Sequence, residues 1–86
     1  MMAQPDDIEV TVLYLGPLKQ RCGGSEERLT VRAETLADVY AAVAARHGLS
    51  PTPGPVRAAI NAELRPWTAR VGAGDVIALL PPVSGG

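Results

Sequence analysis

The sequence has few of the residues on which catalytic and metal sites depend. Its 86 residues include one cysteine, one histidine, one tryptophan and no phenylalanine. Cys22 and His47 are far apart in the chain and match no zinc-binding spacing. The Gly-Ala-Gly-Asp segment 72–75 lacks the lysine and hydroxyl of a phosphate-binding loop, and no Gly-x-Ser-x-Gly motif is present. These absences argue against an independent active site and predict that the chain holds no metal and no cofactor.

Charge and hydropathy exclude two classes of partner. A formal net charge of −1 argues against nucleic acid, which selects a concentrated basic face. The longest apolar runs fall well short of the roughly 20 residues that span a membrane. The start, MMAQPDDIEV, has acidic residues and a proline where a secretory signal has positive charge and an apolar block. With a lone cysteine that cannot form an internal disulfide, the chain is predicted to be cytoplasmic.

A chain of this length predicts one small domain, residues 1–86, with a loose leader at 1–7 and an extended tail at 81–86. Alternating apolar residues predict strands at 8–16 and 28–33, joined by a long turn, and further strands are expected at 56–61, near 63–67 and at 76–80. Because one helix can cover only one sheet face, the fold class is α+β with a mixed sheet.

The helix is the clearest local prediction. Thr35 is a suitable N-cap, and Asp38 lies three residues on, where its carboxylate can complete a capping box. Apolar residues follow at helical spacing from Leu36, and Gly48 can end the helix in the left-handed conformation. His47 is expected to cap this helix or lie on the surface.

Three other residues receive structural interpretations. Cys22 is interpreted as a loop or core thiol in preference to a sulfur relay. Trp67 is expected at the edge of the core, with a partner contact as the alternative. Asn61 is expected to satisfy a turn.

The open sheet face carries unexplained leucines. If Val12, Tyr14 and Leu79 point inward, alternation places Leu13, Leu15 and Leu80 on the uncovered face. A contiguous apolar patch on a small protein marks a docking site, whereas a register error of one residue would reverse the faces.

The chain ends in Pro-Pro-Val-Ser-Gly-Gly. Pro81 and Pro82 cannot extend sheet hydrogen bonding, so they separate the tail from the sheet. Gly85 and Gly86 make a thin end that fits a narrow channel and presents the terminal carboxylate.

The ending LLPPVSGG resembles that of MoaD-type sulfur carriers, the small subunit of molybdopterin synthase in the ubiquitin-like MoaD/ThiS family. The segments VLYLGPLKQRCG, TLADVYAAVAARHG, AAINAEL and VGAGDVIALLPPVSGG resemble successive parts of that family, so the resemblance covers almost the whole chain. It implies a ubiquitin-like β-grasp fold.

The resemblance also implies a chemistry for the tail. An E1-like (MoeB-type) enzyme would use ATP to adenylate Gly86, and a persulfide enzyme would supply sulfur for a thiocarboxylate. The tail would then enter a larger, MoaE-type catalytic subunit in a hetero-oligomer and give its sulfur to a pyranopterin precursor of the molybdenum cofactor. The chain itself would not be catalytic. Its partner-binding residues would be Leu13, Leu15, Leu80, Pro81, Pro82, Val83 and Ser84, although the family's aromatic residues near this surface are missing.

Three alternatives remain open on the sequence. The same tail could carry sulfur for thiazole, tRNA thiolation, cysteine or a secondary metabolite. It could instead be a protein modifier joined to lysines through Gly86. In a plain interaction domain, the glycines would have no function.

Overall fold

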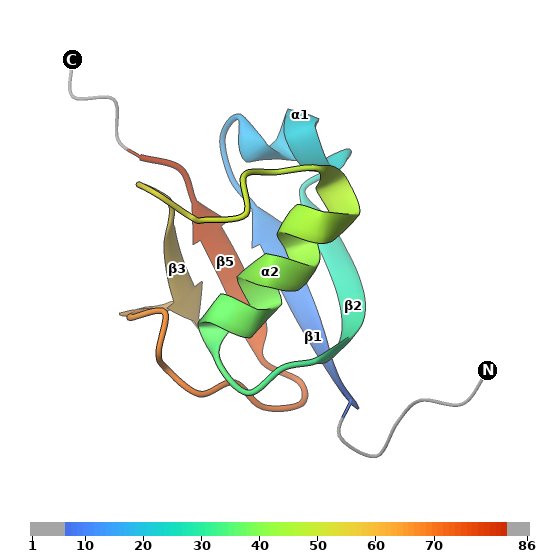
Figure 1. Ribbon diagram of the computed structural model, residues 1–86, viewed down its shortest axis with the longest axis vertical. Coiled ribbons are helices and arrows are strands. Elements are labelled where there is room, and N and C mark those ends of the chain that lie inside the picture. The colour runs from blue at the N-terminus through green and yellow to red at the C-terminus, as the bar shows by residue number, and fades with distance from the viewer. Residues whose placement is uncertain (1–6, 83–86) are drawn as a thin grey trace.

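The computed structural model describes residues 7–82, which form one five-stranded sheet crossed on one face by the longer of two helices (Figure 1). The elements in chain order are β1 (Asp7–Tyr14), α1 (Leu18–Cys22), β2 (Glu26–Arg32), α2 (Leu36–His47), β3 (Arg57–Ile60), β4 (Glu63–Arg65) and β5 (Val76–Leu80). The strand order is β2-β1-β5-β3-β4. The central pair, β1 and β5, is parallel and the other neighbours are antiparallel, which confirms the predicted α+β fold with a mixed sheet.

The core lies between α2 and the inner face of the sheet. Alternation in β1 and β5 works as predicted, because the inward residues are almost fully buried. The largest of the fully buried side chains are Val10, Val12, Tyr14, Leu36, Val39, Val43, Ile77 and Leu79. The inward positions of Val12, Tyr14 and Leu79 fix the register, so every second residue between them faces away from α2.

Helix α2 begins and ends at the predicted residues. The Asp38 carboxylate accepts hydrogen bonds from the backbone N–H groups of Glu34 and Thr35, at 2.9 and 3.1 Å. These bonds lower the pKa of Asp38. At the other end Gly48 is left-handed, with φ of 68°, and the Leu49 N–H donates to the Ala44 carbonyl at 3.0 Å.

The segment between β1 and β2 differs from its prediction. It was expected to be a long turn, but it contains the short helix α1, and β2 begins at Glu26, two residues before the predicted start. An isolated helix of this length is marginal, so sequence pattern gives little sign of it. Here Leu18 packs on the core and Cys22 is buried, which holds the turn of helix in place.

The first strand also has different bounds. It begins at Asp7, which pairs with Arg32 and was assigned to the leader, and it ends at Tyr14, before the predicted Gly16. Leu15 and Gly16 therefore belong to the β1–α1 turn.

Candidate functional site

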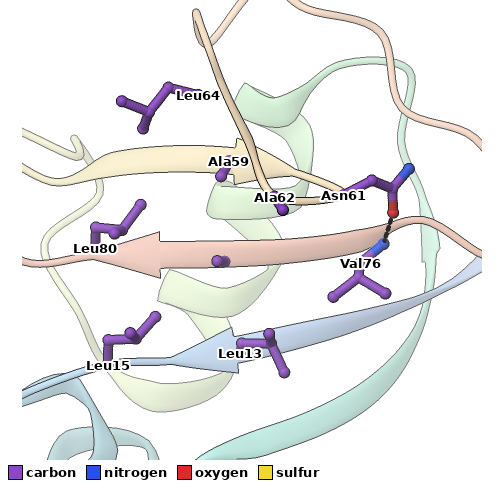
Figure 2. A pocket seen from close by; sticks show the side chains of 9 residues that line it. Leu13, Leu15, Ala59, Asn61, Ala62, Leu64, Val76 and Leu80 are labelled. Carbon is purple, nitrogen blue, oxygen red and sulfur yellow. Dashed lines mark hydrogen bonds between the residues drawn. The ribbon is translucent and has the colours of Figure 1, made fainter.

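An apolar hollow of about 590 Å³ lies on the sheet face opposite α2 (Figure 2). We call it the trough. It is lined by Leu13, Leu15, Ala59, Asn61, Ala62, Leu64, Val76, Ala78 and Leu80. The structure thus brings together the three leucines that the sequence assigned to the open face. Their role in docking stays a prediction.

Strand register explains why this face is hollow. Leu13 pairs with Ala78, Ala78 with Ala59, and Ala59 with Leu64, so four strands contribute one row of side chains. The two middle positions are alanine and the two outer positions are leucine. Small side chains therefore form the floor and large ones the rims. Ala59 is only 7% exposed, although it does not belong to the core between α2 and the sheet.

The rims of the trough are unusually open for large apolar residues. Leu64 is 65% exposed and Leu15 39% exposed, the two large hydrophobic side chains among residues 7–82 that remain open to solvent. No lining residue carries a charge, and Asn61 supplies the polar side chain. Such a surface favours a partner that presents apolar side chains.

Sequence reasoning missed two thirds of the lining. Leu64 lies between Glu63 and Arg65 in a three-residue strand, too short to show alternation. Ala59 and Ala78 are small and could face either side of a sheet. The strand pairings were the missing information, because β1–β5 pairing places Ala78 beside Leu13, and the pairing of β3 with β5 and β4 then adds Ala59 and Leu64 to the same row.

Asn61 closes one end of the trough. Asn61 and Ala62 both have positive φ, 50° and 73°, as the two-residue turn between the paired Ile60 and Glu63 requires. The Asn61 side-chain oxygen accepts a hydrogen bond from the Val76 N–H at 2.9 Å (Figure 2), and its amide group donates to Asp75 at 3.1 Å. The predicted turn role is confirmed, and the side chain also joins this turn to the start of β5.

The other end of the trough meets the exit of the C-terminal tail. Leu80 ends β5 and is followed by Pro81 and Pro82. A second hollow, of about 1000 Å³, shares Leu64 and Leu80 with the trough and is also lined by both prolines. The predicted residues Val83, Ser84, Gly85 and Gly86 lie outside the described part of the chain. Pro81 and Pro82 therefore lie beside the end of the trough.

A charged cluster supports the sheet on its other face, beneath this end. Glu27 accepts hydrogen bonds from the Tyr14 hydroxyl at 2.8 Å and from Arg46, and it lies 2.7 Å from His47 Nε2. The His47 ring also meets Tyr14 edge-on, with centroids 5.7 Å apart. His47 was expected to cap α2 or lie on the surface. Its side chain is instead only 16% exposed, because it contacts Tyr14 of β1 and Glu27 of β2.

Burial and hydrogen bonding oppose each other at Glu27. Burial raises the pKa of this carboxyl, but the bonds from His47, Tyr14 and Arg46 outweigh it and lower the pKa to about 2. Burial, with the bond to Glu27, raises the pKa of Tyr14. Glu27 is therefore a fixed negative charge that holds Tyr14, the last residue of β1 before the turn bearing Leu15.

The remaining singled-out residues have structural environments. Cys22 is a buried core thiol, as predicted, and burial raises its pKa, which disfavours the reactive thiolate. Trp67 is partly buried and meets Tyr40 edge-on at 5.5 Å, which confirms its place at the edge of the core. Residues 7–82 contain no group of three or more potential metal-binding side chains. None of their helices is long and apolar enough to cross a membrane.

Solved structures confirm the ubiquitin-like β-grasp fold. SAMP1 from Haloferax volcanii is 24% identical, with a TM-score of 0.75, over 91% of this chain and 99% of that one. The ubiquitin of Caldiarchaeum subterraneum is also 24% identical, with a TM-score of 0.62, over 93% of this chain and 99% of that one. At 24% identity, both structures support the assignment of the fold alone.

A third solved structure is nearer in sequence. A chain in the protein–protein complex of subunits 1 and 2 of molybdopterin-converting factor from Helicobacter pylori is 34% identical, with a TM-score of 0.62. The match covers 92% of this chain and 100% of that one. That protein was solved with a partner protein.

Family membership follows from the sequence match. No match is found among curated protein sequences. The model of the ThiS family, however, matches residues 12–86, which include the trough leucines and the Gly-Gly end. Small carriers of this type are not catalytic by themselves. The chain belongs to the ThiS family of ubiquitin-like sulfur carriers.

Proposed function

We propose that this chain is the sulfur-carrying small subunit of a molybdopterin synthase. The observation that carries the proposal is the position of the trough, an uncharged apolar surface that adjoins the exit of the Gly-Gly tail at Leu80. A partner seated on the trough would receive the tail directly in its active site. The 34% identity to a chain of the Helicobacter pylori complex supports this pathway over others.

The terminal carboxylate of Gly86 would carry the sulfur. A carboxylate resists substitution because its charge is delocalised and oxide is a poor leaving group. An activating enzyme would transfer AMP from ATP to the carboxylate, releasing pyrophosphate. The terminal sulfur of an enzyme persulfide would displace AMP, and a second thiol would reduce the resulting acyl disulfide, leaving the thiocarboxylate and an enzyme disulfide. Because this cycle uses ATP and free thiols, we also propose a cytoplasmic location.

The thiocarboxylate would then act inside the large subunit. Its sulfur would displace an oxygen substituent from a carbon of the pyranopterin precursor, forming a C–S bond as the C–O bond breaks. Water would then hydrolyse the resulting thioester, leaving the sulfur on the precursor and returning the Gly86 carboxylate for another cycle. This chain contributes a nucleophile on a narrow arm and a docking surface. The catalytic side chains would belong to the partner, and Leu13, Leu15, Leu80, Pro81 and Pro82 would lie in the hetero-oligomeric interface, with Val83 and Ser84 continuing into the partner.

The test is reconstitution with a purified molybdopterin synthase large subunit. Thiocarboxylated chain should bind that subunit and convert the cyclic pyranopterin precursor to the dithiolene product. Leu80→Asp, which places a charge in the trough, should weaken binding by about a hundredfold or more. Thr30→Asp is the matched control, because Thr30 is exposed on β2 and does not line the trough. Failure of the wild-type chain to bind the subunit or form product would refute the proposal.

A second candidate is favoured by the ThiS family match and by the fold shared with an archaeal modifier protein. In that case Gly86 would pass sulfur to another biosynthetic enzyme or form an amide with a lysine. Covalent lysine adducts in cells, or capture of a different sulfur-using synthase, would support this candidate. Both functions need Gly86, so its deletion does not distinguish them, but the identity of the acceptor does.

A further inference from the structure

In the turn after β1, Gly16 lies against Pro81, the first residue after β5. Gly16 has a φ of 58°, and a Cβ built on it would lie 3.0 Å from Pro81 Cγ and 3.9 Å from Pro81 Cδ. This is tighter than nine in ten real Cβ contacts, so a side chain at position 16 would require the Pro81 ring to move by a few tenths of an ångström. Among the glycines of residues 7–82, Gly16 alone has such a close neighbour.

Both sides of this contact are anchored. β1 and β5 run parallel, and Tyr14 pairs with Leu79, so the residues that follow them leave the sheet side by side (Figures 1 and 2). On the β1 side, the Leu15 and Gly16 carbonyls accept hydrogen bonds from Leu18 at 3.2 Å and Lys19 at 3.1 Å. The turn is thereby fixed to α1, whose Cys22 is buried in the core.

On the tail side, packing takes the place of hydrogen bonding. A proline has no N–H, so neither Pro81 nor Pro82 can be held by a donor bond to the sheet. The ring of Pro81 has Gly16 as its close support on the β1 side. The Pro81 ring can lie this close to the β1–α1 turn because position 16 carries no side chain.

We propose that Gly16 is a positioning residue for sulfur transfer. By admitting the Pro81 ring against the β1–α1 turn, it fixes the exit of the tail beside Leu15 and Leu80 at the end of the trough. This inference rests on the proposed function, because the tail must enter the partner while the trough holds it. Gly16 does not line the trough, so it should affect the delivery of Gly86 more than the affinity for the partner.

The experiment compares Gly16→Ala with Gly48→Ala. Gly48, the C-cap of α2, also has a positive φ, 68°, but no atom lies within 4 Å of its built Cβ. Both variants introduce backbone strain, and only the first displaces Pro81. We expect both to bind the large subunit within about twofold of wild type, while Gly16→Ala slows single-turnover sulfur transfer about tenfold or more.

A double-mutant cycle identifies the contact responsible. Pro81→Ala removes the ring that Gly16→Ala would strike, so adding Gly16→Ala to Pro81→Ala should slow transfer by much less than tenfold. Independent effects in this cycle, or a transfer rate of Gly16→Ala equal to that of Gly48→Ala, would overturn the proposal. A loss of binding that accounts for the whole rate defect would overturn it as well, since that indicates a general structural role.

A measurement on the isolated chain separates this inference from the proposed function. A nuclear Overhauser contact between Gly16 Hα and Pro81 Hγ should be equally strong in the wild type and in Gly48→Ala and weaker in Gly16→Ala. If the wild type shows the contact but transfers no sulfur to the pyranopterin precursor, the proposed function fails and Gly86 adenylation becomes the rate to compare. If the wild type lacks the contact, this inference fails whatever the acceptor is.

Discussion

Replacing Glu27 with glutamine should remove the charge that holds the end of β1 in place. Glu27 accepts hydrogen bonds from Tyr14 and Arg46 and faces His47. Its negative charge also contributes to the raised pKa of the buried Cys22 thiol. Glutamine keeps the shape and one acceptor oxygen but loses the negative charge. Because Tyr14 is the residue before Leu15, the substitution perturbs the support of the trough without touching its lining.

The expected loss can be worked from the pKa of Glu27. Three hydrogen bonds overcome the effect of burial and lower it from the ordinary 4.5 to about 2. At about 1.4 kcal/mol per pKa unit, the folded state gains on the order of 3 kcal/mol from the ionised carboxylate. For a domain of this size, such a loss lowers the melting temperature by roughly 12–24 °C.

The sign of the pH dependence follows from the lowered pKa. The contribution is fully present above the ordinary value and is lost as pH falls from about 4.5 towards 2. Urea unfolding at pH 7, 5, 4 and 3 should therefore give a gap between wild type and Glu27→Gln that narrows with acid.

Glu26→Gln is the matched control. Glu26 precedes Glu27 in β2, is exposed and faces the opposite side of the sheet, so its loss of charge should change stability by less than about 0.5 kcal/mol. A gap for Glu27→Gln that stays the same from pH 7 to pH 3, or that is no larger than the Glu26→Gln gap, would refute the reasoning.

Three further predictions concern the trough, the core and the thiol. Leu64→Ser should lower affinity for the large subunit by about tenfold or more in calorimetry while changing stability by less than about 1 kcal/mol, because Leu64 is 65% exposed; unchanged affinity would remove this rim from the interface. Ile77→Ala, at a fully buried position, should cost about 2–5 kcal/mol in urea unfolding, and a loss below about 1 kcal/mol would contradict the assigned core. The Cys22 thiol, buried and with a raised pKa, should react with a disulfide reagent only as fast as the protein opens; labelling at the rate of a free thiol in native buffer would show that it is accessible.

Local signals determined the parts of this protein that local physics can fix. The first and last residues of helix α2 were predicted correctly, because Thr35 and Asp38 satisfy its first N–H groups and Gly48 ends it. All three signals lie in or next to the helix itself. The inward face of β1 was predicted because a strand alternates by geometry. The Gly-Gly end was visible because it needs no partner within the chain.

The tertiary structure decided the site. Leu13, Ala78, Ala59 and Leu64 share one row only because β5 inserts between β1 and β3, a pairing of segments that are distant in sequence. The same insertion brings Pro81 against Gly16. Helix α1 also depends on tertiary structure, because the packing of Leu18 and Cys22 against the core holds it in place. Alternation states which side of its own strand a residue faces, but only strand order states which residues become its neighbours, and a docking surface is made of neighbours.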